Sequence, residues 1–201
     1  MAPERLSGDL LQDWHRYSSD PRGWKAVLAR LIFDAGFTTV FLFRLASRLQ
    51  RGGKLVRARL IHRFNMALCA CELSPNATVG PGLFLPHPFG VTIGTGCEVG
   101  PEVTLYQGVV VGATSAGGQD DGAVRYPRLG REVVIYPHAL VYGGIEVGDG
   151  TVVLGNSVVN RDLVAGGTYA GAPASRVLPR GAPKDAVEAD APLADGGDRP
   201  S

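Results

Sequence analysis

The chain has 201 residues, long enough for one domain with a sizeable core or for a small domain with an accessory segment. Its 20 basic and 19 acidic residues leave a net charge of +1, which gives no reason to expect nucleic acid or an anionic membrane as a partner. The three cysteines, Cys69, Cys71 and Cys97, form no C-x-x-C pair, so we expect neither a disulfide framework nor a zinc site.

Residues 1–71 form the first predicted region, a short helical segment with only five glycines. Asp20 followed by Pro21 is typical of a helix start, because Asp caps the N-terminus and Pro suits the first helical position. The helix that follows carries apolar residues three and four positions apart: Trp24, Val27, Leu28, Leu31 and Ile32. Two more helices are expected over residues 38–53 and 54–71.

Targeting signals are not evident in this region. The first twenty residues lack the apolar core of a signal peptide, and the most apolar stretch, residues 31–43, is too short to span a bilayer. We therefore expect a soluble cytoplasmic protein. His15 and His62 fall in the predicted helices, and surface or packing roles are expected for both.

The second predicted region, residues 72–178, repeats with a period of six. Six residues suit one short strand and one corner, and three such units close a triangular coil with the repeated aliphatic pointing inwards. This hexapeptide pattern resembles the left-handed parallel β-helix family, and the handedness is implied by that resemblance. The predicted class is therefore mainly β, a left-handed parallel β-helix preceded by a short α-helical segment. Three runs carry the period: Leu73, Val79, Leu85 and Val91; Ile93, Val99, Leu105 and Val111; Leu129, Ile135, Val141, Val147, Val153 and Val159.

Two stretches depart from the repeat. Residues 112–128 are glycine-rich and break the period, which favours an extruded loop folding over a site, with an inert insertion as the alternative. Residues 179–201 are rich in Pro, Ala, Asp and Gly and are expected to form a disordered tail.

Within this framework the chain resembles the serine O-acetyltransferases. The resemblance implies acetyl-CoA-dependent transfer of an acetyl group to serine or a close amino acid, within cysteine biosynthesis or a specialised pathway. It also implies a homotrimer with active sites between neighbouring subunits. Four stretches carry it: "SSDPRGW" with "DAGFTTVFLFR", "ELSPNATVGPGLFLPHPFGVTIG", "LYQGVVVGATSAGG" with "VRYPRLG", and "AGAPASRVL".

The resemblance assigns the catalytic pair. His87 corresponds to the general base, and Glu72 to the carboxylate that orients it. Imidazole suits proton removal from an alcohol near neutral pH, and a carboxylate on its other nitrogen fixes the ring. Glu72 lies 15 residues before His87, so we expect it one coil away.

The acceptor and donor sites are assigned in the same way. Asp20 corresponds to the group that binds the substrate ammonium, and Arg125 to the one that binds its carboxylate. Pro86 and Tyr126 replace an Asp and a His of the family pattern, which favours an acceptor other than free serine. Three positions are expected to line the thioester, with backbone N–H groups around the second stabilising the oxyanion: Gly112, Ala113 and Thr114. Two more are expected to contact coenzyme A: Ala139 and Pro173.

Alternative functions stay open. The first is an O-acetyltransferase that acts on a sugar, a polysaccharide unit or a secondary metabolite. The second is a hexapeptide carbonic anhydrase, which needs three histidines on a metal, whereas only His87 and His138 lie in the repeat. For His138 we expect a wall or surface role, and we expect no metal cofactor. The third is a non-catalytic trimeric scaffold or binding module.

Overall fold

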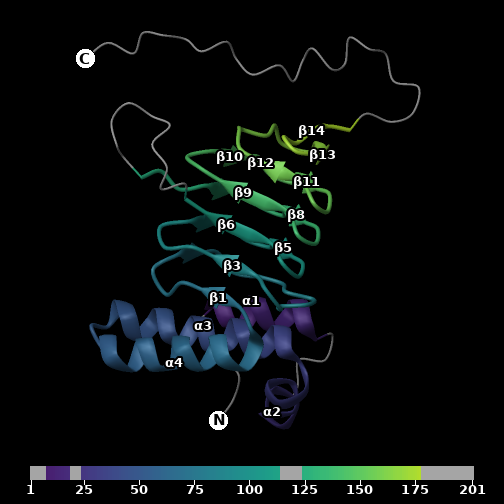
Figure 1. The fold of residues 1–201 in the computed structure, drawn as a ribbon. Helices are drawn as coiled ribbons and strands as arrows, with labels where there is room; N and C mark the ends of the chain where they lie inside the picture. Colours follow the sequence, from purple (N-terminus) through teal and green to yellow (C-terminus); the bar gives the residue numbers. More distant parts are fainter. Residues whose placement is uncertain (1–7, 19–23, 114–123, 178–201) are drawn as a thin grey trace.

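The computed structural model describes residues 8–18, 24–113 and 124–177, which form helices followed by a stack of short strands (Figure 1). The predicted helix start at Asp20, most of the predicted loop and the predicted tail lie outside the described residues. The helices are α1 (Gly8–Tyr17), α2 (Trp24–Phe33), α3 (Ala35–Arg51) and α4 (Leu55–Cys69).

The predicted helices are present, with boundaries that follow local capping. α3 begins three residues before its predicted start because the Asp34 side chain accepts a hydrogen bond from the Phe37 N–H at 3.0 Å. It ends at the predicted Gly52–Gly53 pair, where Gly53 has a φ of +73°. The apolar stripe predicted on α2 is only partly covered, since Ile32 is 65% exposed.

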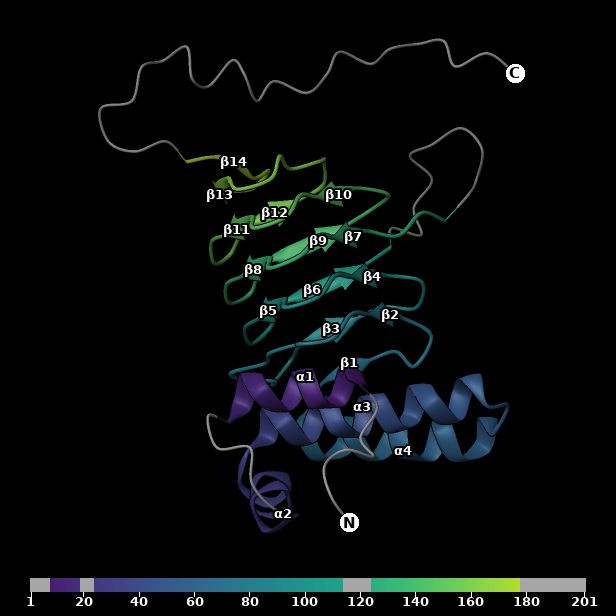
Figure 2. The ribbon, with the colours of Figure 1, turned by 180° about the vertical axis from the view of Figure 1, so that it is seen from behind.

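α1 and α3 close one end of the strand stack, as Figures 1 and 2 show. Asp13 of α1 is fully buried, pairs with Arg44 of α3 at 2.8 Å and accepts the Gly82 and Leu83 N–H groups. Arg44 also donates to two carbonyl oxygens of the first coil. The first coil has no other coil on its outer side. Its backbone groups there are partly paired by the buried side chains of Asp13 and Arg44.

The outer helices leave apolar surface exposed. α4 packs on α3, and its outward side presents Val56, Leu60 and Phe64, each more than half exposed. Among the described residues no single helix is both long and apolar enough to cross a membrane. A pair bent by 105°, residues 25–33 with α3, passes such a test only when the two are joined.

The strands form three parallel sheets, one on each side of a triangular prism. The first sheet contains β1 (Glu72–Leu73), β3 (Thr92–Ile93), β6 (Val110–Gly112), β9 (Leu140–Tyr142) and β12 (Val158–Val159). The second contains β2 (Thr78–Val79), β4 (Glu98–Val99), β7 (Arg128–Leu129) and β10 (Glu146–Val147). The third contains β5 (Thr104–Leu105), β8 (Val134–Ile135), β11 (Val152–Val153), β13 (Thr168–Ala170) and the antiparallel β14 (Ser175–Arg176).

The repeated aliphatics fill the prism, as the period predicts. Each coil pairs with the next through backbone hydrogen bonds, so that Ile93 lies over Leu73 and Val111 over Ile93. The fourteen aliphatics of the three runs are between 0% and 9% exposed. Stacking therefore buries one layer of apolar side chains per coil.

Two corners of the prism border the first sheet. The leading corner consists of the turns that enter the first sheet: residues 86–91, 106–109, 136–139 and 154–157. The trailing corner consists of the described turns that leave it: residues 74–77, 94–97, 113, 124–127, 143–145 and 160–162.

Candidate active site

His87 lies at the leading corner in a two-residue insertion. Glu72 pairs with Thr92, twenty positions on, whereas Thr92 pairs with Val110, eighteen positions on. Phe84 pairs with Thr104 through a bridge, and the Gly108 N–H bonds to the Phe89 oxygen. The two extra residues therefore lie between Phe84 and Phe89. Pro86 and His87 therefore stand outside the ladder.

This insertion answers why a histidine stands in an apolar run. The flanking Leu85 and Val91 are fully buried, whereas His87 is exposed. From the sequence, Val91 was predicted to stand in the inner aliphatic column. Its turn aligns it with Val109 instead, because each valine donates its N–H to the carbonyl oxygen three residues earlier, Val91 to Pro88 and Val109 to Tyr106. The signal was present in the sequence, since one run of the repeat ends at Val91 and the next begins two residues later at Ile93.

Glu72 lies beside the His87 turn but not one coil away in register. Its register partner is Thr92, and its backbone N–H donates to the Val91 oxygen at 2.8 Å. The Gly90 N–H donates to the Ala70 oxygen at 2.7 Å, which brings the two segments together. No hydrogen bond or ion pair joins the Glu72 carboxylate to the His87 ring, and both side chains are exposed.

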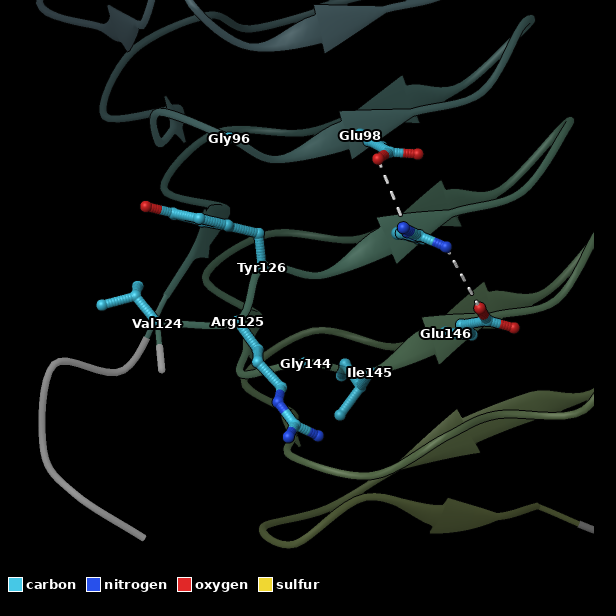
Figure 3. A pocket seen from close by; sticks show the side chains of 9 residues that line it. Gly96, Glu98, Val124, Arg125, Tyr126, Gly144, Ile145 and Glu146 are labelled. Carbon is cyan, nitrogen blue, oxygen red and sulfur yellow. Dashed lines mark ion pairs between the residues drawn. The ribbon is translucent and has the colours of Figure 1, made fainter. Parts of the chain in front are cut away.

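Arg125 and Tyr126 lie at the other end of the first sheet, at the trailing corner. The Tyr126 ring packs over Gly96, and the Arg125 side chain packs over Gly144, so a Cβ at either glycine would clash (Figure 3). These residues line a pocket of about 350 Å³, a size that accommodates an amino acid. Neither Gly96 nor Gly144 was predicted from the sequence to belong to the site.

The wall of this pocket carries a ladder of charges on the second sheet. Arg128 lies between Glu98 and Glu146, at 3.5 Å and 3.8 Å, and all three side chains are more than half exposed. Figure 3 shows this ladder running beside the pocket. At this exposure the ion pairs contribute little to the stability of the fold, and their main effect is to place charges beside the pocket.

One chain does not bring His87 and Arg125 together. The two corners of the first sheet are separated by about four extended residues, or about 13 Å. A substrate the size of serine is too short to contact both. The arrangement instead suits a site made by the leading corner of one chain and the trailing corner of another.

The predicted donor residues are spread over both corners. Gly112 and Ala113 are partly exposed at the trailing corner, and a Cβ at Gly112 would meet open space. Pro173 is exposed in a turn whose Ala174 N–H bonds to the first-sheet strand β12. Thr114 and Asp20 lie outside the described residues.

The expectation for Ala139 needs correction. It is fully buried, with its side chain inside the prism, and its backbone N–H and oxygen are both paired within the coil. The exposed residue of that turn is His138, which adopts a φ of +62° with its ring packed over Gly108. His138 therefore occupies the surface position that was expected of it.

Other reactive groups are set apart from this surface. All three cysteines are free thiols, buried, and burial raises the pKa of Cys71 to about 11. Among the described residues no three side chains of His, Cys, Asp or Glu come together to hold a metal ion.

Comparison with known proteins relates this arrangement to a family. No family model matches the chain. The serine acetyltransferase of Helicobacter pylori strain J99 is 37% identical over 147 residues, covering 73% of this chain and 84% of that protein.

Two solved structures extend the comparison. The serine acetyltransferase of Neisseria gonorrhoeae in complex with serine has a TM-score of 0.73 at 26% identity, covering 88% of this chain and 70% of that one. The serine acetyltransferase of Brucella abortus strain S19 in complex with coenzyme A has a TM-score of 0.73 at 27% identity, covering 87% and 68%. The chain spans about two thirds of the length of the solved chains it matches.

The predicted class is confirmed by these structures and by the sheet topology: a left-handed parallel β-helix of hexapeptide repeats that follows short helices. The predicted domain boundaries at residues 71 and 178 stay predictions.

Proposed function

The chain belongs to the serine acetyltransferase family, and we propose that it transfers the acetyl group of acetyl-CoA to the hydroxyl of L-serine or a close amino acid. The observation that carries this proposal is the placement of His87. A two-residue insertion holds its imidazole outside an otherwise closed ladder, at a corner that a substrate can reach.

His87 acts as the general base in this proposal. As the acceptor oxygen attacks the thioester carbonyl carbon, His87 accepts the hydroxyl proton. The tetrahedral intermediate then collapses with cleavage of the C–S bond, and the coenzyme A sulfur leaves with the proton that His87 returns. No protein nucleophile is needed, which agrees with the burial of all three thiols.

Glu72 orients His87 once substrate has bound. The two residues lie on adjoining backbone segments, and catalytic hydrogen bonds are often long in the substrate-free state. A carboxylate on the second ring nitrogen selects the tautomer that can accept a proton and stabilises the imidazolium that forms.

Ala113 supplies the oxyanion donor in this proposal. Its backbone N–H lies at the end of β6, where the neighbouring Gly112 leaves open space for the thioester. A backbone donor is already oriented before the reaction, so it stabilises developing negative charge without reorganisation. Thr114, which lies outside the described residues, is the third residue proposed to contact the thioester.

Arg125 binds the acceptor carboxylate through its paired N–H donors, and Asp20 binds the ammonium. Pro86 and Tyr126 shape the remainder of the acceptor site. The Tyr126 ring, seated over Gly96, offers bulk and a hydroxyl in place of a second charged or imidazole group.

A homotrimer completes the site. The outward residues of the first sheet are largely apolar and half-buried, such as Val110, Leu140 and Val158, whereas the second sheet presents Glu98, Arg128 and other charges. The first-sheet face is therefore suited to contact a second copy. A closed threefold ring lets the leading corner of each chain meet the trailing corner of the next.

A cytoplasmic location is part of the proposal. Its support is that all three cysteines are free, although Cys69 and Cys71 are near neighbours in the chain.

The acceptor alternative is specific to this chain. Because Tyr126 and Pro86 depart from the family pattern, a sugar or secondary-metabolite hydroxyl is the second candidate. Release of coenzyme A should be measured with acetyl-CoA and L-serine, homoserine, amino sugars and simple alcohols. We expect turnover with serine or another amino acid, and turnover with amino sugars alone would favour the second candidate.

A further inference from the structure

Gln107, at the leading corner, carries a buried amide oxygen without a hydrogen bond. Its Oε1 has no partner among the described residues, although its backbone oxygen accepts from the His138 N–H at 3.0 Å. Buried polar groups in folded proteins are nearly always paired, so this acceptor points to a donor outside the chain.

Gln107 is the neighbour of the catalytic turn in the next coil. It holds the position that Phe89 holds in the first coil, because the Gly108 N–H bonds to the Phe89 oxygen at 2.9 Å. His87 is two residues before Phe89 in the chain. Since adjacent coils lie about 4.8 Å apart, a group that reaches His87 along this corner passes Gln107.

An aromatic wall flanks Gln107. Tyr106 and Tyr136 occupy the same turn position in successive coils, with ring centroids 5.0 Å apart and planes at 6°. Tyr136 is 39% exposed, so its ring can be reached from solvent. A flat apolar wall beside one acceptor suits a flexible chain that contains both methylene and N–H groups.

The corner also has the length for such a chain. The turn that contains Pro173 bonds to Ser157 and Val158, at the far end of the same corner. From the His87 coil to that coil is three steps, or about 14 Å. A compact acceptor does not span this distance, whereas the pantetheine arm of acetyl-CoA, with two amides, does.

We propose that Gln107 Oε1 accepts an amide N–H of the pantetheine arm, with Tyr106 and Tyr136 forming the wall along which the arm lies. This rests on the proposed use of acetyl-CoA and adds a donor-binding residue to it. Gln107 binds the arm equally in the ground and transition states, so its loss should affect donor affinity and leave turnover at saturation unchanged.

The test compares Gln107→Leu with Gln50→Leu, a matched change of a glutamine that bonds Asn76 far from this corner. Binding of coenzyme A is measured by calorimetry, and binding of adenosine 3′,5′-bisphosphate, which lacks the arm, by competition. Gln107→Leu should weaken coenzyme A binding about three- to tenfold, as for a lost neutral hydrogen bond, and leave the nucleotide unchanged. Gln50→Leu should change neither.

Kinetics supply the second readout. Gln107→Leu should raise the KM for acetyl-CoA by the same factor, with kcat and the acceptor KM within about twofold of wild type. If this variant loses its circular-dichroism signal, Gln107→Met, of similar length, takes its place with the same expectation.

Three results for Gln107→Leu overturn the proposal. The first is unchanged coenzyme A affinity, and the second is an equal loss of affinity for the nucleotide. The third is a smaller oligomer with unchanged coenzyme A affinity, which would assign the hydrogen-bond donor to a neighbouring subunit. If wild type binds coenzyme A but acetylates no amino acid, the proposed acceptor fails while the Gln107 test by binding still applies. If wild type binds no coenzyme A, both proposals fail.

Discussion

The leading and trailing corners of the first sheet present their functional residues by different means. At the leading corner, two extra residues in a well-paired turn lift His87 out of the ladder. At the trailing corner, the chain leaves the ladder after β6 and returns at β7, and two glycines receive the side chains of Tyr126 and Arg125. One corner displays a single group, and the other builds a pocket.

This difference shows that a solenoid places the residues proposed for chemistry and those proposed for substrate binding at separate corners. A repeat that buries every inner side chain has only its corners to vary, and each corner can hold only part of a site. In the proposed function, chemistry at one corner and substrate binding at the other call for a second chain. Substitutions at the two corners should therefore have different effects on catalysis and binding.

The largest effect is expected at the leading corner. His87→Ala should leave the circular-dichroism spectrum unchanged and lower kcat by about 10²–10⁴-fold, because it removes the base and no packed group. Single-turnover release of coenzyme A measures the loss. Activity within threefold of wild type would make His87 a structural residue.

The trailing corner should respond in binding instead. Arg125→Lys keeps the charge and loses the paired donors. Transition-state stabilisation should fall by about 1–3 kcal/mol, so kcat/KM for an amino-acid acceptor should fall about 5- to 150-fold. The KM for acetyl-CoA should stay nearly constant. Steady-state kinetics with each substrate varied in turn separate the two, and an unchanged acceptor KM would contradict an amino-acid acceptor.

Mixing the corners tests whether they meet between chains. When His87→Ala and Arg125→Ala chains are unfolded, combined in equal amounts and refolded together, about a quarter of the sites should contain neither change, because each site draws one corner from each of two chains. Activity near a quarter of wild type is expected, with separately refolded variants as controls. If the mixture stays as inactive as its parents, the two corners act within one chain.

The smallest effect concerns the seat of Tyr126. Gly96→Ala adds a methyl where the Tyr126 ring lies, at a φ of +81°. Gly150→Ala is the matched control, since Gly150 has a φ of +65° and open space around it. Both should lose about 1–2 kcal/mol of stability from the left-handed backbone. Only Gly96→Ala should also raise the acceptor KM, by a few-fold, and equal KM values for the two variants would show that the ring does not shape the pocket.

Much of the fold could be predicted because the repeat is local and periodic. The spacing of Leu73, Val79 and the later aliphatics predicted the triangular coil, and the Gly52–Gly53 pair predicted where α3 ends. The role of α1 could not be predicted, because Asp13 accepts hydrogen bonds from Gly82 and Leu83, about seventy positions away. Local patterns carry no information about such pairs.

The site divides in the same way. His87, Glu72, Arg125 and Tyr126 were selected by motif, and the family they resemble is the one to which the chain belongs. The motif did not show that Glu72 and His87 lie on adjoining segments of the first coil, or that Ala139 faces the core. The two-residue insertion decides the first, and the burial of the Ala139 side chain inside the prism decides the second.

The sequence by itself determined the period, the inward aliphatics, the chemical groups available and the family, because each depends on residue type at short spacing. Tertiary structure decided which two residues of the first coil, Pro86 and His87, stand outside the ladder. It alone decided that Gln107 keeps an unpaired oxygen nearby and that Arg125 lies at the opposite corner. These facts depend on how one coil registers on the next. Hydrogen bonds between coils set that register, and they join residues eighteen or more positions apart.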